Sequence, residues 1–256
     1  MTFIDTHTHL YTDDFENDRT DIINKAISAG VDKFLLPNID ESSIQGMFAL
    51  QTEFPNHCFP MLGLHPCSVT KDFDSALEKI KALIDKEEII AIGEIGIDLY
   101  WDKSLLNEQI QAFKIQVEWA KVLKLPIAIH VRDAFNEVFS VLDELNDDSL
   151  TGVFHCFTGD EKQAEKVLSY GGFKLGIGGV VTFKNSGLDK VLSNIDLKHL
   201  VLETDSPYLA PVPYRGKRNE STYIPIIAKK LASIYQKDIL EIGHITTLNA
   251  KSLFNL

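Results

Sequence analysis

Residues 2–10 read TFIDTHTHL, a short apolar run that leads into Asp5 and then into two histidines, His7 and His9. The same design recurs along the chain. Eight short apolar runs each end in a polar residue or a glycine, and segments with the helical spacing of apolar residues lie between them. Near-continuous apolar strands that alternate with helices are typical of parallel β/α units. Eight such units in 256 residues predict an α/β protein with a (β/α)8 TIM-barrel fold, in a single domain over residues 1–256.

The alternation can be followed over the whole chain. The runs predicted as strands are residues 3–4, 33–36, 59–64, 89–95, 127–129, 153–154, 173–177 and 200–202. The clearest helical segments are residues 15–30, 73–88, 107–124 and 133–146, and two further helices are expected in 221–256. The main alternative architecture is an open doubly wound sheet. No G-x-G-x-x-G motif follows the first run, which argues against the dinucleotide-binding form of that alternative.

Composition restricts the class of protein. With 45% hydrophobic and 24% charged residues the chain is typical of a folded protein, and no apolar run has the length of a membrane span. The net charge of −12 argues against extended, nonspecific binding to duplex nucleic acid, although local binding of a few phosphates is compatible with it. Three widely spaced cysteines without a C-x-x-C pair predict neither a disulfide framework nor a zinc ribbon. Since no signal peptide is evident, we expect a cytoplasmic protein.

Histidines and acidic residues gather at the ends of the predicted strands. In a TIM barrel the carboxyl ends of the strands form one rim, and this rim carries the chemistry. Five of the eight histidines fall there with three acidic residues: His7 and His9 after the first strand, His65 after the third, Glu94 at the end of the fourth, His130 and His155 at the ends of the fifth and sixth, and Glu203 and Asp205 at the end of the eighth. Chance would scatter these residues.

The spacing of His7 and His9, two residues apart, suits two ligands of one metal ion. Neutral imidazoles are ligands that zinc, manganese and iron accept. In an extended backbone, side chains two residues apart point to the same side, as a single ion requires. Each histidine alone has an ordinary alternative, a hydrogen-bonded structural role at a strand end. The convergence of six candidate ligands on one rim favours a metal site over six separate structural explanations.

The remaining candidates complete a site for two ions. Glu94 has two oxygens with which to bridge the ions, although a carboxylate close to two glycines also suits a loop. His130 and His155, on neighbouring strands, would hold the second ion. Asp205 would close the first site and orient an attacking water, and its ordinary alternative is a helix N-cap. Two ions about 3.5–4 Å apart stabilise the attacking and the leaving oxygen of a hydrolysis together.

Taken in order, the motifs resemble those of the TatD-like metal-dependent deoxyribonucleases, a branch of the amidohydrolase-like barrels. The resemblance covers essentially the whole chain, in the segments DTHTHL (5–10), GLHP (63–66), GEIGID (93–98), PIAIHVRD (126–133), FHCFTG (154–159), LETDSPYLAP (202–211), RGKRNES (215–221) and TTLNAKSLF (246–254). Thr8 and the segment IDLYWD (97–102) depart slightly from the usual pattern, and neither departure affects a ligand position.

The resemblance implies a role for every candidate ligand. The family's positions are all occupied, by the H-x-H ligands His7 and His9, the bridging Glu94, the second-site ligands His130 and His155, and Asp205, which is also the general base toward the attacking water. The resemblance also implies two divalent ions per chain, magnesium or manganese in function, with zinc possible. The implied activity is a 3′–5′ deoxyribonuclease on DNA ends or single strands. Deacylation of D-aminoacyl-tRNA at the same site stays open as an alternative.

Cations near the rim are candidates for holding phosphate. Arg132 lies two residues after His130, and Arg215 and Arg218 lie in the glycine-containing basic segment YRGKRN (214–219) beyond the eighth strand. Planar guanidinium groups suit phosphate oxygens. The ordinary alternative for each of these residues is a solvated surface charge.

Other residues near the rim are candidates for contacts to the substrate or support of the ligands. His65 is expected to contact a phosphate or the water network, or to cap its strand. Glu203 is expected to support the ligands from behind, unless it is simply a buried, paired carboxylate. Bases could stack on one or two of the aromatic residues that follow strand ends, with core or lid packing as the alternative for each: Tyr100, Trp101, Phe157 and Tyr208.

Two rival functions remain open. The first is a small-molecule amidohydrolase or lactonase, in which a carboxylated lysine often bridges two ions; here the strand-four position is Glu94. The second is a noncatalytic binding protein that keeps the barrel, against which the full ligand set argues. We expect a monomer without a membrane segment or an obligate protein partner, acting on DNA ends or single-stranded DNA.

Overall fold

The computed structural model describes residues 2–256 and contains one sheet of eight parallel strands in the order β1 to β8. The strands are β1 (Phe3–Asp5), β2 (Val31–Pro37), β3 (Cys58–Leu62), β4 (Ala91–Asp98), β5 (Ile127–Arg132), β6 (Gly152–Phe154), β7 (Phe173–Ile177) and β8 (Leu200–Leu202). The Thr6 amide donates to the Leu202 carbonyl (3.0 Å), which brings the last strand to the first. The predicted (β/α)8 barrel is confirmed.

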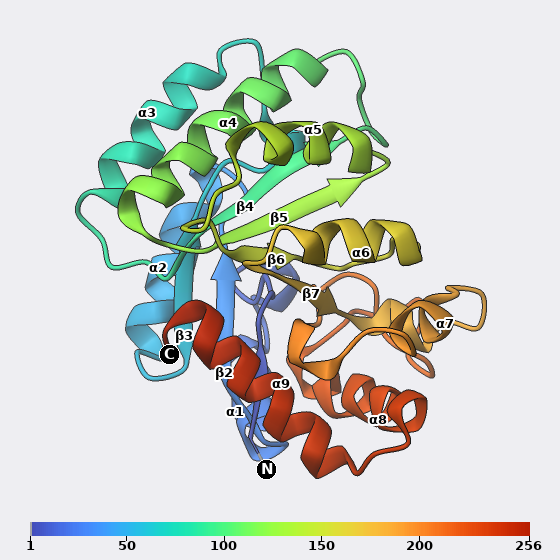
Figure 1. The fold of residues 1–256 in the computed structure, drawn as a ribbon. Helices are drawn as coiled ribbons and strands as arrows, with labels where there is room; N and C mark the ends of the chain where they lie inside the picture. Colours follow the sequence, from blue (N-terminus) through green and yellow to red (C-terminus); the bar gives the residue numbers. More distant parts are fainter. Residues whose placement is uncertain (1) are drawn as a thin grey trace.

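Helices connect the strands and cover the outside of the sheet (Figure 1). They are α1 (Arg19–Ser28), α2 (Ile44–Glu53), α3 (Phe73–Ile84), α4 (Leu106–Leu123), α5 (Phe135–Leu145), α6 (Glu161–Ser169), α7 (Leu188–Leu192), α8 (Ile224–Tyr235) and α9 (Ile239–Phe254). The helical segments predicted from apolar spacing all form, because each buries its apolar face against the sheet. None of the described helices is long and apolar enough to cross a membrane.

Two hydrophobic clusters make up the core. The larger lies between the strands and the surrounding helices. The smaller one fills the barrel, because seven of the strands each contribute one buried side chain to it: Ile4, Leu35, Met61, Ala91, Ala128, Val153 and Val201. Ala250 and Phe254 of α9 join this inner cluster. The barrel is therefore packed along its axis, and α9 closes its amino-terminal end.

Strand β4 is longer than predicted and irregular. Its pairing with β5 shifts register between Ile92 and Ile95, so Glu94 lies within the strand and not at its end. The strand continues to Asp98 because Ile95 and Ile97 are apolar and pair with β5. Gly96, at φ +143°, permits the close approach, since a Cβ there would lie 2.0 Å from the His130 carbonyl oxygen. The irregularity leaves the Glu94 side chain buried at the carboxyl end of the barrel.

Candidate active site

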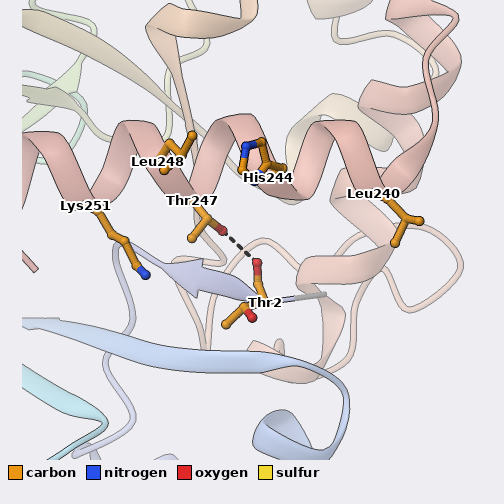
Figure 2. Close-up of a pocket in the computed structure, with 6 residues that line it drawn as sticks. All are labelled: Thr2, Leu240, His244, Thr247, Leu248 and Lys251. Carbon is orange, nitrogen blue, oxygen red and sulfur yellow. Dashed lines mark hydrogen bonds between the residues drawn. The ribbon is translucent and has the colours of Figure 1, made fainter.

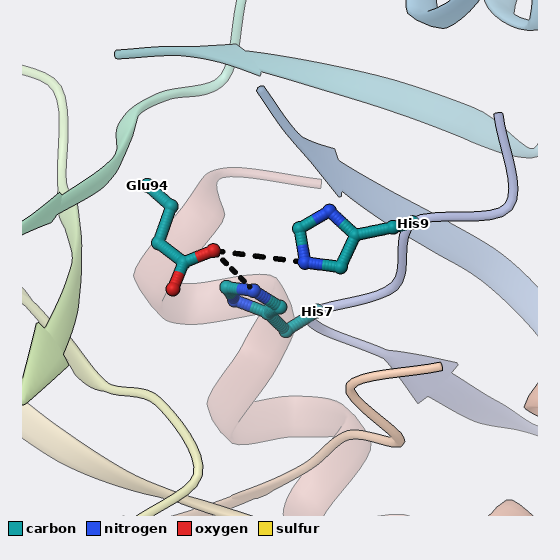
Figure 3. Close-up of side chains that lie close together, drawn as sticks. All are labelled: His7, His9 and Glu94. Atoms are coloured by element: carbon teal, nitrogen blue, oxygen red, sulfur yellow. Dashed lines mark hydrogen bonds and ion pairs between the residues drawn. The ribbon is translucent and has the colours of Figure 1, made fainter. Parts of the chain in front are cut away.

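Glu94 lies at the centre of a cluster of imidazole rings, and its two oxygens face different groups. Oε2 lies 3.1 Å from His7 Nε2 and 3.6 Å from His9 Nε2 (Figure 3). Oε1 lies 2.8 Å from His130 Nδ1, 2.8 Å from His155 Nε2 and 3.2 Å from His65 Nε2. Five histidines from four separate strand ends thus surround one carboxylate.

Asp205 approaches the same cluster from the loop after β8. Its Oδ1 lies 3.8 Å from His7 Nε2 and 3.6 Å from His9 Nε2. The Asp205 amide donates to the His7 carbonyl (2.9 Å), so the two segments are held together through the backbone as well. Asp205 adopts φ +57°, a left-handed conformation that is uncommon for a residue other than glycine. Asp205 therefore faces the same side of Glu94 as the H-x-H pair.

The charges of this cluster depend strongly on one another. Burial alone would raise the pKa of Glu94, but the surrounding histidines, His155 and His65 foremost, hold the pKa of that carboxyl well below its usual value. Burial lowers the pKa of His7, whereas Glu94 raises the pKa of His155 well above its usual value despite burial. Glu94 has no lysine or arginine partner among residues 2–256, and the two closest imidazoles at its Oε1, those of His130 and His155, are the ones whose pKa is raised.

The donor set fits divalent metal ions. Nitrogen and carboxylate oxygen atoms lie within 4.8 Å of one another in three groups: His7, His9 and Glu94; His65, Glu94 and His130; and His7, His155 and Glu203. The Nδ1 atoms of His7 and His155 and the Oε2 atom of Glu203 are buried without a hydrogen-bond partner in the described part of the chain. Polar atoms are seldom left in this state in the interior of a protein. Neutral imidazole and carboxylate are ligands that zinc and manganese share.

Two residues that orient the histidines were missed by the sequence reasoning. Asp98 Oδ2 lies 2.9 Å from His130 Nε2, and Tyr11 Oη lies 2.8 Å from His9 Nδ1. Such partners fix which ring nitrogen faces a metal ion. The Asp98 carboxylate is also charged, because its hydrogen bond to His130 outweighs burial and lowers its pKa to about 2. The motif GEIGID ends on Asp98, which is the only signal that pointed to it.

Glu203 lies behind the histidine cluster, fully buried. Its Oε1 accepts a short hydrogen bond from the Cys156 amide and lies 3.7 Å from His155 Nδ1. Gly176 on the neighbouring strand makes room for the carboxylate, since a Cβ there would lie 2.2 Å from Glu203 Oε2. The structure thus brings Glu203 to the far side of His155, where the sequence reasoning expected a supporting residue.

Asp5 is a second buried carboxylate that the sequence reasoning did not assign. It accepts hydrogen bonds from the Thr204 amide and hydroxyl and from the Ser221 hydroxyl, at 2.9, 2.6 and 2.7 Å. Burial raises the pKa of Asp5 to about 7 despite these bonds. Asp5 therefore ties the end of β1 to the loop that carries Asp205.

The arginines predicted to bind phosphate differ in their environments. Arg218 forms a two-pronged ion pair with Asp18, at 2.9 and 2.6 Å, and so is already engaged. The Arg215 guanidinium lies over the Phe183 ring, 4.4 Å from its centroid. Arg132 lies over the Tyr100 ring at 3.7 Å. Of the three, the structure ties down only Arg218 by a carboxylate.

Among the aromatic residues near the rim, Phe157 belongs to the core. It is 3% exposed and packs against Phe135, so it offers no face to a base, and for this residue core packing, the stated alternative, holds. The apolar ring is buried because the segment after β6 turns inward onto α5. Tyr208, by contrast, is half exposed and its ring lies 6.1 Å from that of His9. Tyr100 and Trp101 are exposed.

A separate pocket of about 430 Å³ lies at the opposite end of the barrel, between the residue before β1 and helix α9 (Figure 2). Thr2, His244 and Thr247 are among its lining residues, and the Thr247 hydroxyl donates to the Thr2 carbonyl (2.7 Å). Because Thr2 precedes β1 whereas His7 and His9 follow it, this pocket is remote from the histidine cluster and shares no residue with it.

Fold and donor set together define a metal-dependent hydrolase of the (β/α)8-barrel class. A family model described as "TatD related DNase" matches residues 4–255. The chain therefore belongs to the TatD-related DNase family.

Relatives agree with this assignment. The chain is 36% identical over 253 residues to the uncharacterized metal-dependent hydrolase YabD of Bacillus subtilis, covering 98% of each chain. It is 33% identical over 258 residues to the 3′-5′ ssDNA/RNA exonuclease TatD of Yersinia pseudotuberculosis, covering 98% of this chain and 99% of that protein. The crystal structure of YjjV, a TatD homolog from Escherichia coli, superposes with a TM-score of 0.92 at 30% identity, covering 99% of this chain and 98% of that one.

Proposed function

We propose that this protein is a 3′–5′ exonuclease that hydrolyses phosphodiester bonds at the ends of single-stranded DNA. The observation that carries the proposal is the position of Glu94. One of its oxygens faces His7 and His9, and the other faces His130 and His155. This arrangement suits a carboxylate that bridges two divalent ions. The name of the Yersinia relative, a 3′-5′ ssDNA/RNA exonuclease, supports the choice of substrate.

His7, His9 and Asp205 would hold one ion, His130 and His155 the other, and Glu94 both. Magnesium or manganese would serve in function, and zinc suits the same ligands. When bound, the ions would acidify a water molecule and neutralise the charge that develops on the phosphate. His65, whose Nε2 lies 3.2 Å from Glu94 Oε1, would contact the phosphate beside the second ion.

Asp205 would accept the proton of the attacking water. Its Oδ1 faces the imidazoles of His7 and His9, and the pKa of Asp205 is lowered despite burial, chiefly by the nearby rings of His9 and His155. Glu203 would keep the His155 ring in place, because its Oε1 lies 3.7 Å from His155 Nδ1. Asp205 and Glu203 would thus both act within the cluster of histidines around Glu94.

The distribution of charge favours strand ends over intact duplex. With a net charge of −12 the protein repels a long polyanion, and attraction is confined to the rim of the barrel. Arg215 and Arg132 have no carboxylate partner among residues 2–256, so their guanidinium groups are available to phosphate, and Tyr208 is half exposed beside His9. Arg218 would contribute only if its pair with Asp18 opens. We further propose that the protein is a cytoplasmic monomer. Light scattering in solution tests the monomeric state.

The test is release of nucleotides from 3′-end-labelled single-stranded DNA in the presence of manganese or magnesium. Metal-dependent release is expected from the wild type and is expected to vanish with EDTA. Asp205→Asn should lower kcat by at least about 100-fold, because a general base contributes 10²–10⁴-fold to such reactions. A folded Asp205→Asn variant that keeps wild-type kcat would remove Asp205 as the base.

The alternative substrates become outcomes of the same test. If metal-loaded protein releases no nucleotide from DNA or RNA, D-aminoacyl-tRNA esters are the next substrates to assay, and small amides and lactones follow. These reactions would use the same ligands and the same water. Hydrolysis of none of them would favour a noncatalytic binding protein.

A further inference from the structure

Tyr100, Trp101 and Arg132 form an exposed unit beside the candidate active site, which we call the aromatic platform. Tyr100 is 53% and Trp101 71% exposed, and their rings meet edge to face at 4.9 Å. The Arg132 guanidinium lies 3.7 Å from the Tyr100 ring centroid and 5.5 Å from that of Trp101. Single exposed aromatic residues need no explanation, but here Tyr100 and Arg132 pack beside Trp101 and leave its exposed ring as a ready-made surface for stacking.

The platform is fixed to the histidine cluster through one carboxylate. Asp98 Oδ1 accepts hydrogen bonds from the amides of Tyr100 (2.9 Å) and Trp101 (3.3 Å), while its Oδ2 lies 2.9 Å from His130 Nε2. Arg132 lies on β5 two residues after His130, so the two side chains leave the strand on the same side. Asp98 and Arg132 are also register partners in neighbouring strands. The platform is therefore held in a fixed position next to the ligands.

The chemistry of the platform is complementary to a nucleotide. No hydrogen bond or ion pair in residues 2–256 uses the Arg132 side chain, so the donors at its edge are free to bind a phosphate while its face covers Tyr100. Trp101 offers the larger exposed ring, and every base has a π-face that stacks on an aromatic side chain. A base in the interior of a duplex has both faces covered by its neighbours and cannot stack in this way.

We propose that the aromatic platform binds one unpaired nucleobase of the substrate, stacked on Trp101, with Arg132 at the adjoining phosphate. The proposal rests on the nucleic-acid substrate proposed above and extends it, because it gives the site a reason to prefer single strands over duplex. The base would lie next to the phosphodiester that is hydrolysed, since Asp98 joins the platform to His130.

A thermodynamic cycle between protein and substrate tests the platform. The metal-loaded Trp119→Phe protein leaves Trp101 as the one tryptophan of the two in the sequence, and stacking of a base will quench its fluorescence. Phosphorothioate oligonucleotides, which resist hydrolysis, serve as ligands, each with one base near the 3′ end replaced in turn by an abasic residue. At one position we expect the replacement to weaken binding by about 10-fold. In a Trp101→Ala protein, followed by anisotropy of a labelled oligonucleotide, the same replacement should have no effect.

Matched variants separate stacking from charge and from folding. Trp101→Phe keeps a ring and should retain most of the discrimination between the normal and the abasic oligonucleotide. Arg132→Lys keeps the charge. It should weaken the binding of the normal and the abasic oligonucleotide equally, and by a smaller factor than the loss of stacking does. In hydrolysis assays Trp101→Ala should raise KM for the normal strand with kcat within about twofold, since removal of binding that is equal in ground and transition states leaves kcat unchanged.

The outcomes distinguish this proposal from the proposed nuclease. Hydrolysis of DNA together with equal effects of the abasic residue in wild type and Trp101→Ala would overturn the platform and leave the nuclease standing. Quenching and discrimination without hydrolysis would support the platform and count against the nuclease. If no single strand binds the protein or quenches its fluorescence, the platform is overturned.

Discussion

At the scale of single residues, the sequence located the candidate ligands more readily than the residues that support them. His7, His9, Glu94, His130 and Asp205 could be placed because strand ends in a barrel meet at one rim, and the structure brings their side chains together. Supports such as Asp98 and Tyr11 could not be predicted, because their role depends on which ring nitrogen of a histidine points away from the cluster. That orientation follows from packing in three dimensions and leaves no spacing in the sequence.

Asp98 provides a prediction at this scale. Asp98→Asn should weaken the binding of zinc or manganese by about 10–100-fold, because a hydrogen-bonded carboxylate behind a ligand histidine raises its basicity and fixes its ring. Competitive titration against a chromogenic chelator measures the affinity. Asp102→Asn is the matched control: this exposed carboxylate in the loop after β4 accepts from the Ser104 amide, and its removal should leave metal affinity unchanged. Equal effects of the two substitutions would contradict the assignment.

At the scale of elements, the strand and helix pattern was predictable and the irregularity of β4 was not. Apolar runs and helical spacing reflect burial, which a single sequence records directly. The register shift between Ile92 and Ile95 arises from contact between β4 and β5, and the conformation of Gly96 makes it possible. The sequence showed only that glycines lie close to Glu94, which suited a loop equally well.

Gly96→Ala should therefore destabilise the fold by at least about 3 kcal/mol, because the new Cβ would lie 2.0 Å from the His130 carbonyl oxygen and φ is +143°. Urea unfolding followed by circular dichroism measures the loss. Gly187→Ala is the control, since Gly187 has φ +72° with nothing within 4 Å of a Cβ. Its cost should be only about 1–2 kcal/mol, that of the left-handed conformation alone. A Gly96→Ala loss no larger than this would show that β4 can relax.

At the scale of the whole molecule, the barrel is assembled around a cluster that needs positive charge. Glu94 is buried and surrounded by histidines from four strand ends. An ion that binds this cluster joins β1, β4, β5 and β6, and so stabilises the folded chain as a whole. The sequence predicted this architecture because eight strand–helix units repeat over its length, but it gave no information on how tightly the last strand closes on the first.

Removal of metal should accordingly lower the melting temperature. An ion present at about 100 times its dissociation constant stabilises the folded state by about 2.7 kcal/mol, which in a chain of this size corresponds to roughly 5–10 °C. Differential scanning calorimetry with excess manganese and with EDTA measures the difference. Glu94→Gln, which removes the charge shared by both groups of histidines, should show little response to either addition. An identical melting temperature of the wild type in both conditions would argue against tight binding.

The filled axis of the barrel restricts how reactants enter and products leave the candidate active site. Seven strand side chains and Ala250 and Phe254 of α9 pack into one buried cluster, so in residues 2–256 side chains fill the axis between the rim and the opposite face. Reactant and product must pass the same opening. For the proposed exonuclease this means that a strand would not be threaded through the molecule, and each released nucleotide would leave by the opening that admits the next chain end.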